Sequence, residues 1–356
     1  MDQTIGFCTS ADGTRIAYAV AGAGPPLVRT ATWMTHVALD QDGAIWGHWW
    51  RELAKSRTFV RYDQRGCGMS DREAPSYSLD ARVKDLEAVV ESLDLATFDL
   101  LGYSYGAMTA IEYAARHPER VSRMIIYGGF ARGRARSSGR SPAEAAAQGT
   151  LIRALWDRDD ASYLASFAYG MIPDAQAGQL GEAVELLRAS MSGESAMNLG
   201  PFPAESFDVF DRLPEIETPS VVFHSLGSPS VDLEEGRLIA SNLPNARFIG
   251  IPSRNHLLMA DEPGWETFVS ELRAFLNDAR LPPADRTASL ERREGLSRRE
   301  LEALLLICAG KTDRVIADEL SISTRTVSNH VKHILEKTGS ANRAQAAVWA
   351  AHRGLV

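Results

Sequence analysis

The motif Gly102-Tyr103-Ser104-Tyr105-Gly106 places a hydroxyl group where an apolar segment passes into a helical one. The motif fits G-x-S-x-G, which on a sharp strand-to-helix turn holds the serine hydroxyl exposed above a sheet. Such a turn strains the serine backbone, and the flanking glycines let neighbouring backbone pass close by. The motif in this context predicts a nucleophilic Ser104. The alternative interpretation is a glycine-rich turn after a strand.

A second group of polar residues has the spacing of a DNA-reading helix. Residues 313–320 predict a short helix, Ser-Ile-Ser a turn, and residues 324–337 a longer helix with Ser323 as its cap. This spacing is typical of a helix-turn-helix, and the alternative is a small helical bundle for protein contacts. Val327 and Val331 are expected to face inward. The outward positions, candidates for base edges in the major groove, are then Ser328, Asn329 and Lys332.

Short apolar runs alternate with amphipathic helical runs before residue 278. This alternation predicts an α/β fold with a mostly parallel sheet covered on both faces. Residues 131–215 contain helical runs but no clear strand, and we expect them to form a cap over one end of the sheet. Residues 279–294 are polar and contain a Pro-Pro pair, which is typical of a linker. The expected organisation is an α/β domain over 1–278 and an all-α domain over 295–356.

Charge is distributed unevenly over the 356 residues, whose formal net charge is −8. Residues 290–356 carry 11 basic and 8 acidic residues, and the rest of the chain carries 27 and 38. An acidic body with a mildly basic tail suggests two separate tasks, although nucleic acid is only one explanation for so small an excess.

The three cysteines, Cys8, Cys67 and Cys308, are too few and too far apart for a disulfide framework or a zinc site. We therefore expect a reducing, cytoplasmic setting, with no metal and no cofactor. The first residues lack the basic start and apolar run of a signal peptide. No apolar run approaches the roughly 18 residues of a membrane span, so no membrane partner is expected.

Three segments, 61–73, 100–121 and 253–263, resemble the α/β-hydrolase superfamily, and the resemblance covers roughly 1–278. It implies that Ser104 occupies the nucleophile position. It also implies that His256, which follows the last strand in the required order, is the general base. An ordinary loop histidine is the alternative.

The position of the triad acid departs from the family pattern, which is roughly H-G-x-x-D-x-x-V-P. Ser228 occupies that position by register, and Asp232 follows four residues later as a displaced candidate. A triad carboxylate orients the histidine and stabilises its protonated form, and disabling it costs on the order of 10⁴ in turnover in serine proteases. If Ser228 replaces the acid, Ser104 and His256 form a dyad with feeble hydrolysis at best.

The loop of the oxyanion hole departs as well, since the family's usual His-Gly is here Ala31-Thr32-Trp33. The backbone N–H groups of Trp33 and Tyr105 could still form the hole, because that role belongs to the main chain. A concave site under the cap, lined by Trp33, Tyr103 and Tyr105, suits a small, largely apolar ligand. Some cap aromatics either pack in the core or contact the ligand: Trp156, Tyr163, Phe167 and Tyr169.

Residues 296–356 resemble the LuxR/GerE-type DNA-binding domain through the run from Leu296 to Gly339. Family members often carry lysine where this chain has Ser328, so the target sequence is open. The residues expected to hold phosphates are Thr324, Arg325, Thr326 and Lys337. Lys332 could contact either a base edge or a phosphate. The last helix resembles the family's dimerisation helix, with a small-residue face of Ala344, Ala347, Val348 and Ala351.

Together the two parts resemble LuxR-family transcriptional regulators with an N-terminal α/β-hydrolase-like domain. The resemblance implies a homodimer on an inverted-repeat operator in double-stranded DNA and a small-molecule ligand with little or no turnover. One alternative is an active serine hydrolase whose turnover is coupled to DNA binding. Another is a degenerate hydrolase that serves only as a dimerisation scaffold.

Overall fold

The computed structural model describes residues 2–32, 35–133, 142–199, 207–278, 295–320 and 322–352. The chain divides into two compact units, Met1–Ala284 and Asp285–Val356. The division falls within the predicted linker 279–294, which lies outside the described residues. We call the first the hydrolase-like unit and the second the helical unit.

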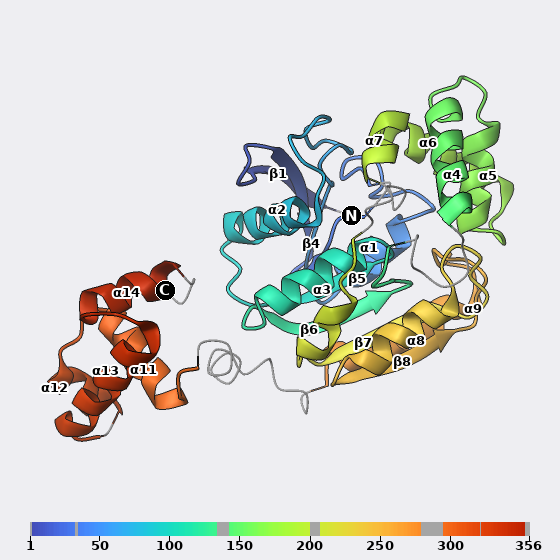
Figure 1. Ribbon diagram of the computed structural model, residues 1–356. Helices are drawn as coiled ribbons and strands as arrows, with labels where there is room; N and C mark the ends of the chain where they lie inside the picture. The colour runs from blue at the N-terminus through green and yellow to red at the C-terminus, as the bar shows by residue number, and fades with distance from the viewer. Residues whose placement is uncertain are drawn as a thin grey trace. The chain divides into compact units, whose positions relative to one another are not determined.

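The hydrolase-like unit is built on an eight-stranded sheet with strand order β1-β2-β4-β3-β5-β6-β7-β8 among the described residues. β1 and β2 pair antiparallel, as do β2 and β4, and the other neighbours pair parallel. The predicted mostly parallel sheet is therefore confirmed (Figure 1). The strands are β1 Gln3–Thr9, β2 Arg15–Ala21, β3 Pro26–Arg29, β4 Thr58–Tyr62, β5 Phe98–Tyr103, β6 Val121–Tyr127, β7 Ser220–Ser225 and β8 Ala246–Ile251.

Helices cover both faces of this sheet, so the central strands are buried throughout. In β5, Leu100 belongs to the core that includes residues of α2, α3 and α8, and the next residue, Leu101, belongs to the core that includes residues of α1 and α9. This alternation follows from the two-residue period of a strand. The covering helices are α1 Gly47–Leu53, α2 Leu79–Ser92, α3 Gly106–Arg116, α8 Leu233–Asn242 and α9 Pro263–Leu276.

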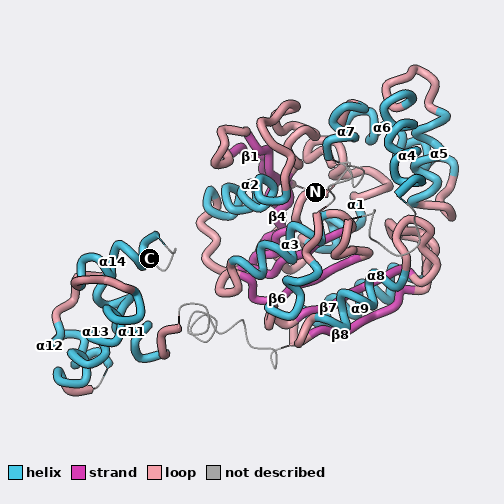
Figure 2. Tube along the Cα trace, viewed as in Figure 1, coloured by secondary structure: helices cyan, strands magenta, loops and turns pink. Residues whose placement is uncertain are grey.

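The segment between β6 and β7 contains several helices and no named strand among its described residues, as predicted for the cap (Figures 1 and 2). Residues 134–141 and 200–206 of this segment lie outside the described residues. The cap comprises α4 Pro142–Leu155, α5 Ser162–Met171, α6 Ala177–Ser190 and α7 Gly193–Leu199, followed by the 3₁₀ helix η1 Phe210–Glu215.

The helical unit has the predicted helix-turn-helix order, and its helix ends are capped as the sequence indicates. Ser297 and Glu300 form a capping box, the Ser323 hydroxyl accepts from the Thr326 N–H, and Gly339 ends a helix with φ of 65°. The helices are α11 Arg298–Cys308, α12 Asp313–Leu320, α13 Thr324–Thr338 and α14 Arg343–His352.

A buried cluster of charges holds the last described turn of the hydrolase-like unit. The Arg57 guanidinium donates to Asp99 at 2.8 Å and to the Leu276 carbonyl at 2.8 Å. Arg123 lies 3.6 Å from Asp99 and donates to the Asp278 carbonyl at 3.2 Å. Asp99 begins the strand that ends at the nucleophile motif, so this cluster ties the start of β5 to the residues that precede the predicted linker.

We expect Asp99→Asn to destabilise the hydrolase-like unit by about 3–5 kcal/mol, because removing one partner leaves a buried charge uncompensated. Urea unfolding followed by tryptophan fluorescence measures this, since all of the seven tryptophans except Trp349 lie in that unit. Asp80→Asn is the control, because its ion pairs with Lys84 and Arg116 are exposed and worth about 1 kcal/mol or less. Equal losses for both variants would contradict the prediction.

Candidate functional site: a Ser-His pair under the cap and a separate helix-turn-helix

Ser104 lies on a strained turn between β5 and α3. Its φ is 50°, a region that residues other than glycine rarely adopt. Its N–H donates to the Tyr127 carbonyl at 2.8 Å, which fixes the turn against β6. A Cβ at Gly106 would lie 2.6 Å from the Thr30 hydroxyl and 2.8 Å from the Ala31 carbonyl, so only glycine fits there. These features give Ser104 the geometry of a nucleophile elbow.

His256 lies beside Ser104, although the two residues are 152 positions apart in the sequence. The His256 Nε2 and Ser104 Oγ atoms are 2.9 Å apart, and the histidine is only 2% exposed. The backbone N–H of His256 donates to the Met171 carbonyl of the cap at 2.8 Å. The Tyr103 hydroxyl donates to the backbone carbonyl of His256 at 3.1 Å. Gly128 packs against the ring, because a Cβ there would lie 2.7 Å from the His256 Cε1 atom.

Neither candidate for the acid position lines the cavity at Ser104. The Ser228 hydroxyl accepts from the N–H groups of Ser230 and Val231 within its own turn, at 3.3 and 3.4 Å. The Asp232 side chain is the N-cap of α8 and accepts from the Glu234 N–H at 2.9 Å. Asp232 is exposed and held in a helix cap, so the structure does not support it as a displaced acid.

Glu262 is a functional candidate that the sequence reasoning missed. Its carboxylate accepts from the Ser253 hydroxyl, the Met259 N–H and the Asn255 side chain, and so braces the loop that carries His256. Asn255 in turn accepts at its carbonyl from the Ser225 hydroxyl at the end of β7. The position of Glu262 directly before Pro263 is a helix-start signal that could have drawn attention to it.

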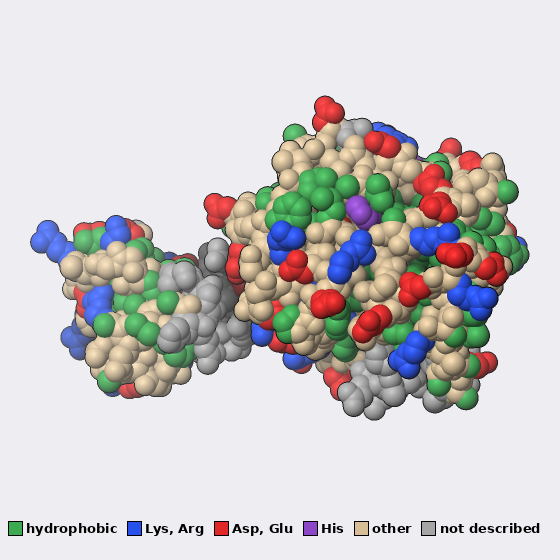
Figure 3. All heavy atoms as spheres, turned by 90° about the horizontal axis from the view of Figure 1, so that it is seen from above, with side chains coloured by type: hydrophobic (Ala, Val, Ile, Leu, Met, Phe, Trp, Pro, Cys, Tyr) green, Lys and Arg blue, Asp and Glu red, His purple; other side chains and the backbone are tan. Residues whose placement is uncertain are grey.

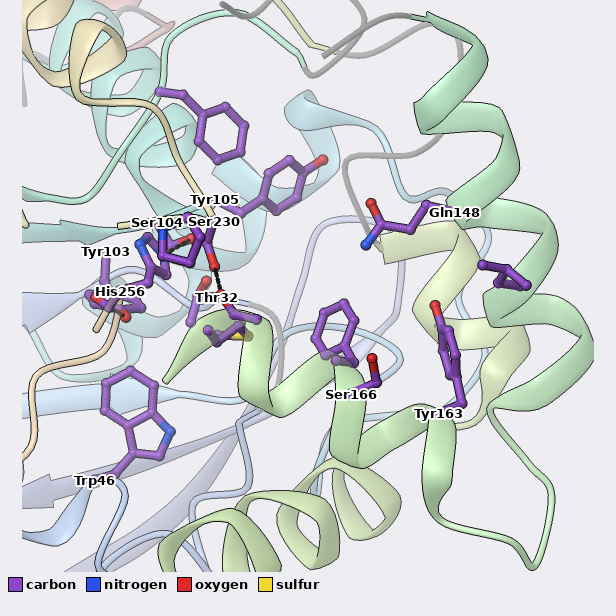
Figure 4. A pocket seen from close by; sticks show the side chains of 16 residues that line it. Thr32, Trp46, Tyr103, Ser104, Tyr105, Gln148, Tyr163, Ser166, Ser230 and His256 are labelled. Atoms are coloured by element: carbon purple, nitrogen blue, oxygen red, sulfur yellow. Dashed lines mark hydrogen bonds between the residues drawn. The ribbon is translucent and has the colours of Figure 1, made fainter. Parts of the chain in front are cut away.

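A cavity of about 340 Å³ lies over the Ser-His pair (Figure 4). This volume falls within the usual range for small-molecule sites. Tyr103 and Tyr105 line it as predicted, and Trp33 lies outside the described residues. The lining residues are Thr32, Trp46, Tyr103, Ser104, Tyr105, Phe130, Gln148, Leu151, Tyr163, Ser166, Phe167, Gly170, Met171, Pro229, Ser230 and His256.

The four cap aromatics divide into two pairs. Tyr163 and Phe167 line the cavity. Trp156 is buried and donates from its indole N–H to the Met191 carbonyl at 3.1 Å, and Tyr169 is 55% exposed. The sequence alone left packing and ligand contact open for all four.

Buried charge supports one wall of the cavity. The Arg29 guanidinium packs on Trp46 and Trp50, 4.8 and 4.9 Å from the ring centroids, and burial lowers its pKa to about 10. Asp40 pairs with Arg61 at 2.7 Å, and burial raises the Asp40 pKa to about 6. The cation–π contacts position Trp46, which lines the cavity.

On α13, the residues predicted to face DNA are exposed. Ser328, Asn329 and Lys332 lie on the outer surface of the helix, and the buried residues Val327 and Ile334 hold its inner side. The Ser328 hydroxyl lies 3.3 Å from the Asp313 carboxylate and 3.1 Å from the Thr324 carbonyl, and these two acceptors share or compete for its single hydrogen. A base contact from Ser328 would compete with these bonds.

Two of the four predicted phosphate-holding residues have partners within the unit. The Lys337 ammonium donates to the carboxylate of Glu300 at 2.7 Å, and the Thr326 hydroxyl lies 2.8 Å from the Ser323 hydroxyl. Thr324 and Arg325 are exposed at the start of α13. The phosphate role therefore suits Thr324 and Arg325 better than Thr326 and Lys337.

The last helix has one buried and one exposed face. Ala346 and Ala350 are fully buried against the other helices. Most of the predicted small-residue face points the other way: Val348 is 55% exposed, Ala344 and Ala351 are exposed, and Ala347 is half-buried.

Comparisons with known proteins agree with this two-part architecture. Residues 41–263 match the family of the alpha/beta hydrolase fold, and residues 294–350 match the luxR family of bacterial regulatory proteins. The chain belongs to the alpha/beta hydrolase fold family and carries, after that domain, a DNA-binding domain of the luxR family.

Individual relatives match one part or the other. The chain is 26% identical to pyrrolizixenacetamide deacetylase of Xenorhabdus hominickii, over 75% of this chain and 97% of that protein. It is 48% identical to the transcriptional regulatory protein LiaR of Bacillus subtilis over 63 residues, 18% of this chain and 30% of LiaR. The solved esterase RhEst1 from Rhodococcus sp. ECU1013 superimposes with a TM-score of 0.63 at 23% identity, over 77% and 98% of the two chains.

No described helix is long and apolar enough to cross a membrane. The described residues also contain no group of three or more His, Cys, Asp or Glu side chains arranged to hold a metal ion.

We expect Gly128→Ala to break the Ser104–His256 hydrogen bond, because the new Cβ would lie within 3.0 Å of two atoms of the His256 ring. The backbone φ of residue 128 is 55°, which also strains any residue other than glycine. Nitrogen-15 chemical shifts of the histidine rings in the full chain measure this, and Ser104→Ala should move the His256 Nε2 signal in the same way. Gly178→Ala, where a Cβ meets nothing within 4 Å, is the control. An unchanged His256 signal in Gly128→Ala would show that the ring is not held as described.

We expect the helical unit to lose stability as the pH falls below the ordinary range of Glu300, near 4.5. Burial opposes ionisation of Glu300, but hydrogen bonds from Lys337 and Ser297 outweigh it and lower the pKa. A lowered carboxyl pKa gives stability that is complete above the unfolded-state value and is lost as pH falls through the folded-state value. Hydrogen exchange of α11 and α13 measures this. Glu300→Gln should flatten the profile, and Glu319→Gln, an exposed partner of Lys311, should not.

Proposed function

We propose that this protein is a DNA-binding transcriptional regulator whose hydrolase-like unit senses a small, largely apolar ligand with little or no turnover. The observation that carries the proposal is a cavity over a hydrogen-bonded Ser104–His256 pair, with Ser228 in place of the acid, in a chain that also has a luxR-family DNA-binding domain. A hydrolase fold by itself does not imply hydrolysis. A ligand that binds one state of the dimer more tightly would shift DNA binding.

The assignment of DNA binding to the helical unit agrees with the charges of the hydrolase-like unit. On the face seen in Figure 3, acidic and basic side chains of the described residues are interspersed, and neither sign forms a stripe. A DNA-binding surface requires clustered positive charge. We further propose that α14 pairs two copies through its exposed face, as the family resemblance implies.

The second candidate function is an active serine hydrolase whose turnover is coupled to DNA binding. The 2.9 Å contact between Ser104 and His256 favours it, since a serine and base within hydrogen-bond reach can form a covalent intermediate. The names of relatives such as the deacetylase favour it as well. The serine at the acid position, Ser228, weighs against it, because a serine hydroxyl cannot stabilise an imidazolium as a triad carboxylate does.

We expect p-nitrophenyl esters to be hydrolysed far below the usual enzymatic range of roughly 1–10³ s⁻¹. Any residual turnover should vanish in Ser104→Ala and remain in Asp232→Asn, because Asp232 caps α8 away from the cavity. Stopped-flow or steady-state release of p-nitrophenol measures this. Turnover within the ordinary range that Ser104→Ala abolishes would favour the hydrolase instead, and its loss in Asp232→Asn would make Asp232 the acid after all.

We expect the full chain to select an inverted repeat from random duplexes, with half-sites about one helical turn apart. Lys332→Ala should weaken binding to all sequences and flatten the salt dependence, because a phosphate contact releases counterions. Asn329→Ala should relax base preference more than it lowers non-specific affinity. Lys84→Ala, which removes the same charge from the hydrolase-like unit, is the control.

The outcomes of that selection separate the candidate functions. A selection that enriches no motif would contradict the proposed regulator function. Enrichment of a single half-site would agree with DNA binding but contradict the proposed dimer. A ligand that changes the enriched affinity in the wild type but not in Ser104→Trp, where the site is filled, would support sensing. An affinity that no cavity ligand changes would favour the third alternative, a dimerisation scaffold.

A further inference from the structure

The cavity over Ser104 has polar groups at two opposite sides. Ser104, His256 and Ser230 stand on one side, and Gln148, Tyr163 and Ser166 stand on the cap side (Figure 4). Gln148 comes from α4, and Tyr163 and Ser166 come from α5. The rest of the lining is mainly apolar, with Trp46, Phe130, Leu151, Phe167, Met171 and Pro229.

Tyr163 is the notable group on the cap side. Its hydroxyl oxygen is buried and has no hydrogen-bond partner among the described residues. Burial raises its pKa, so the hydroxyl keeps its proton and can donate. The Tyr103 hydroxyl, which lies on the Ser104 side, by contrast already donates to the His256 carbonyl (Figure 4). A buried hydroxyl without a partner is rare in folded proteins and calls for an explanation.

The lining also limits the charge of any ligand. None of the described residues that line the cavity is Lys, Arg, Asp or Glu. Burying an ionised group without a counter-charge is strongly unfavourable. An ammonium group therefore does not suit this cavity, and a carboxylate would find its only possible counter-charge among the described lining residues in a protonated His256. Neutral oxygen acceptors need no counter-charge.

We propose that the ligand is an uncharged molecule with two oxygen acceptors on an apolar spacer. One acceptor lies at Ser104 and the other accepts the hydrogen of the Tyr163 hydroxyl. Tyr163 is thus a specificity-determining residue that selects ligands by their second polar group. This inference rests on the proposed sensing function, since it names the ligand class of the same cavity.

The test uses the full chain and two ladders of ketones with seven to eleven carbons. Each linear methyl ketone, such as 2-nonanone, is paired with the diketone of equal length, such as 2,8-nonanedione. Titration calorimetry gives the ratio of the two affinities for the wild type, Tyr163→Phe and Tyr169→Phe. Tyr169 is the matched control, because it lies on the same helix with its side chain exposed.

At the chain length that spans the two sites, Tyr163→Phe should lower the diketone-to-ketone affinity ratio about three- to tenfold, the value of one hydrogen bond. The monoketone should bind Tyr163→Phe as well as the wild type, and Tyr169→Phe should keep the wild-type ratio. Octanoate should bind at least about tenfold more weakly than 2-nonanone, because the only described lining residue that could carry a positive charge, His256, already contacts Ser104. A ratio that Tyr163→Phe leaves unchanged at every length would overturn the inference.

Failure of the proposed function gives a different result. If no ketone binds, or if Ser104→Trp does not block binding, the cavity is not a ligand site and both proposals fall. If the ketones bind with the expected ratios but never change DNA affinity, the ligand class stands and the sensing function falls.

Discussion

The left-handed backbone of Ser104 is the constraint on which the rest of the site depends. With φ at 50°, the turn projects the hydroxyl above the ends of the central strands. The turn requires a glycine at position 106, because a Cβ there would collide with the Thr30–Ala31 segment. Gly128 leaves room in the same way for the His256 ring. The strain is sustained by burial of β5 on both faces and by the bond from the Ser104 N–H to β6.

The loop that carries His256 is tied to the cap as well as to the sheet. Its backbone bonds to the Met171 carbonyl at the end of α5, and Asn255 accepts from the Asp174 N–H at 3.0 Å. The Ser230 hydroxyl donates to the Gly170 carbonyl at 2.6 Å. The helix that presents Tyr163 to the cavity is therefore bonded directly to the residues around the base. A ligand that contacts α5 acts on an element that is coupled to both sides of the cavity.

Each unit contains carboxylates whose role is structural. Asp99 joins Arg57 and Arg123 at the start of β5, and Glu300 joins Lys337 to the capping box of α11. Asp232 caps α8. Pairing or capping supplies the hydrogen bonds that an ionised group needs when water is removed. Asp232, the carboxylate close in sequence to the acid position, meets this need by capping α8.

The sequence by itself determined the local structure. The G-x-S-x-G motif, the alternation of strands and helices, the Ser297 capping box and the Ser323 cap each rest on residues within a few positions of one another. They agree with the structure for that reason, and the family resemblances located His256 and the helix-turn-helix through similarly local motifs. Only the tertiary structure decided which long-range partners meet. It separated Tyr163 and Phe167 from Trp156 and Tyr169, assigned Asp232 to a helix cap, paired Lys337 with Glu300 and placed Glu262 behind the histidine loop. Helical or strand period fixes the face on which a side chain lies, but not which distant element packs against that face.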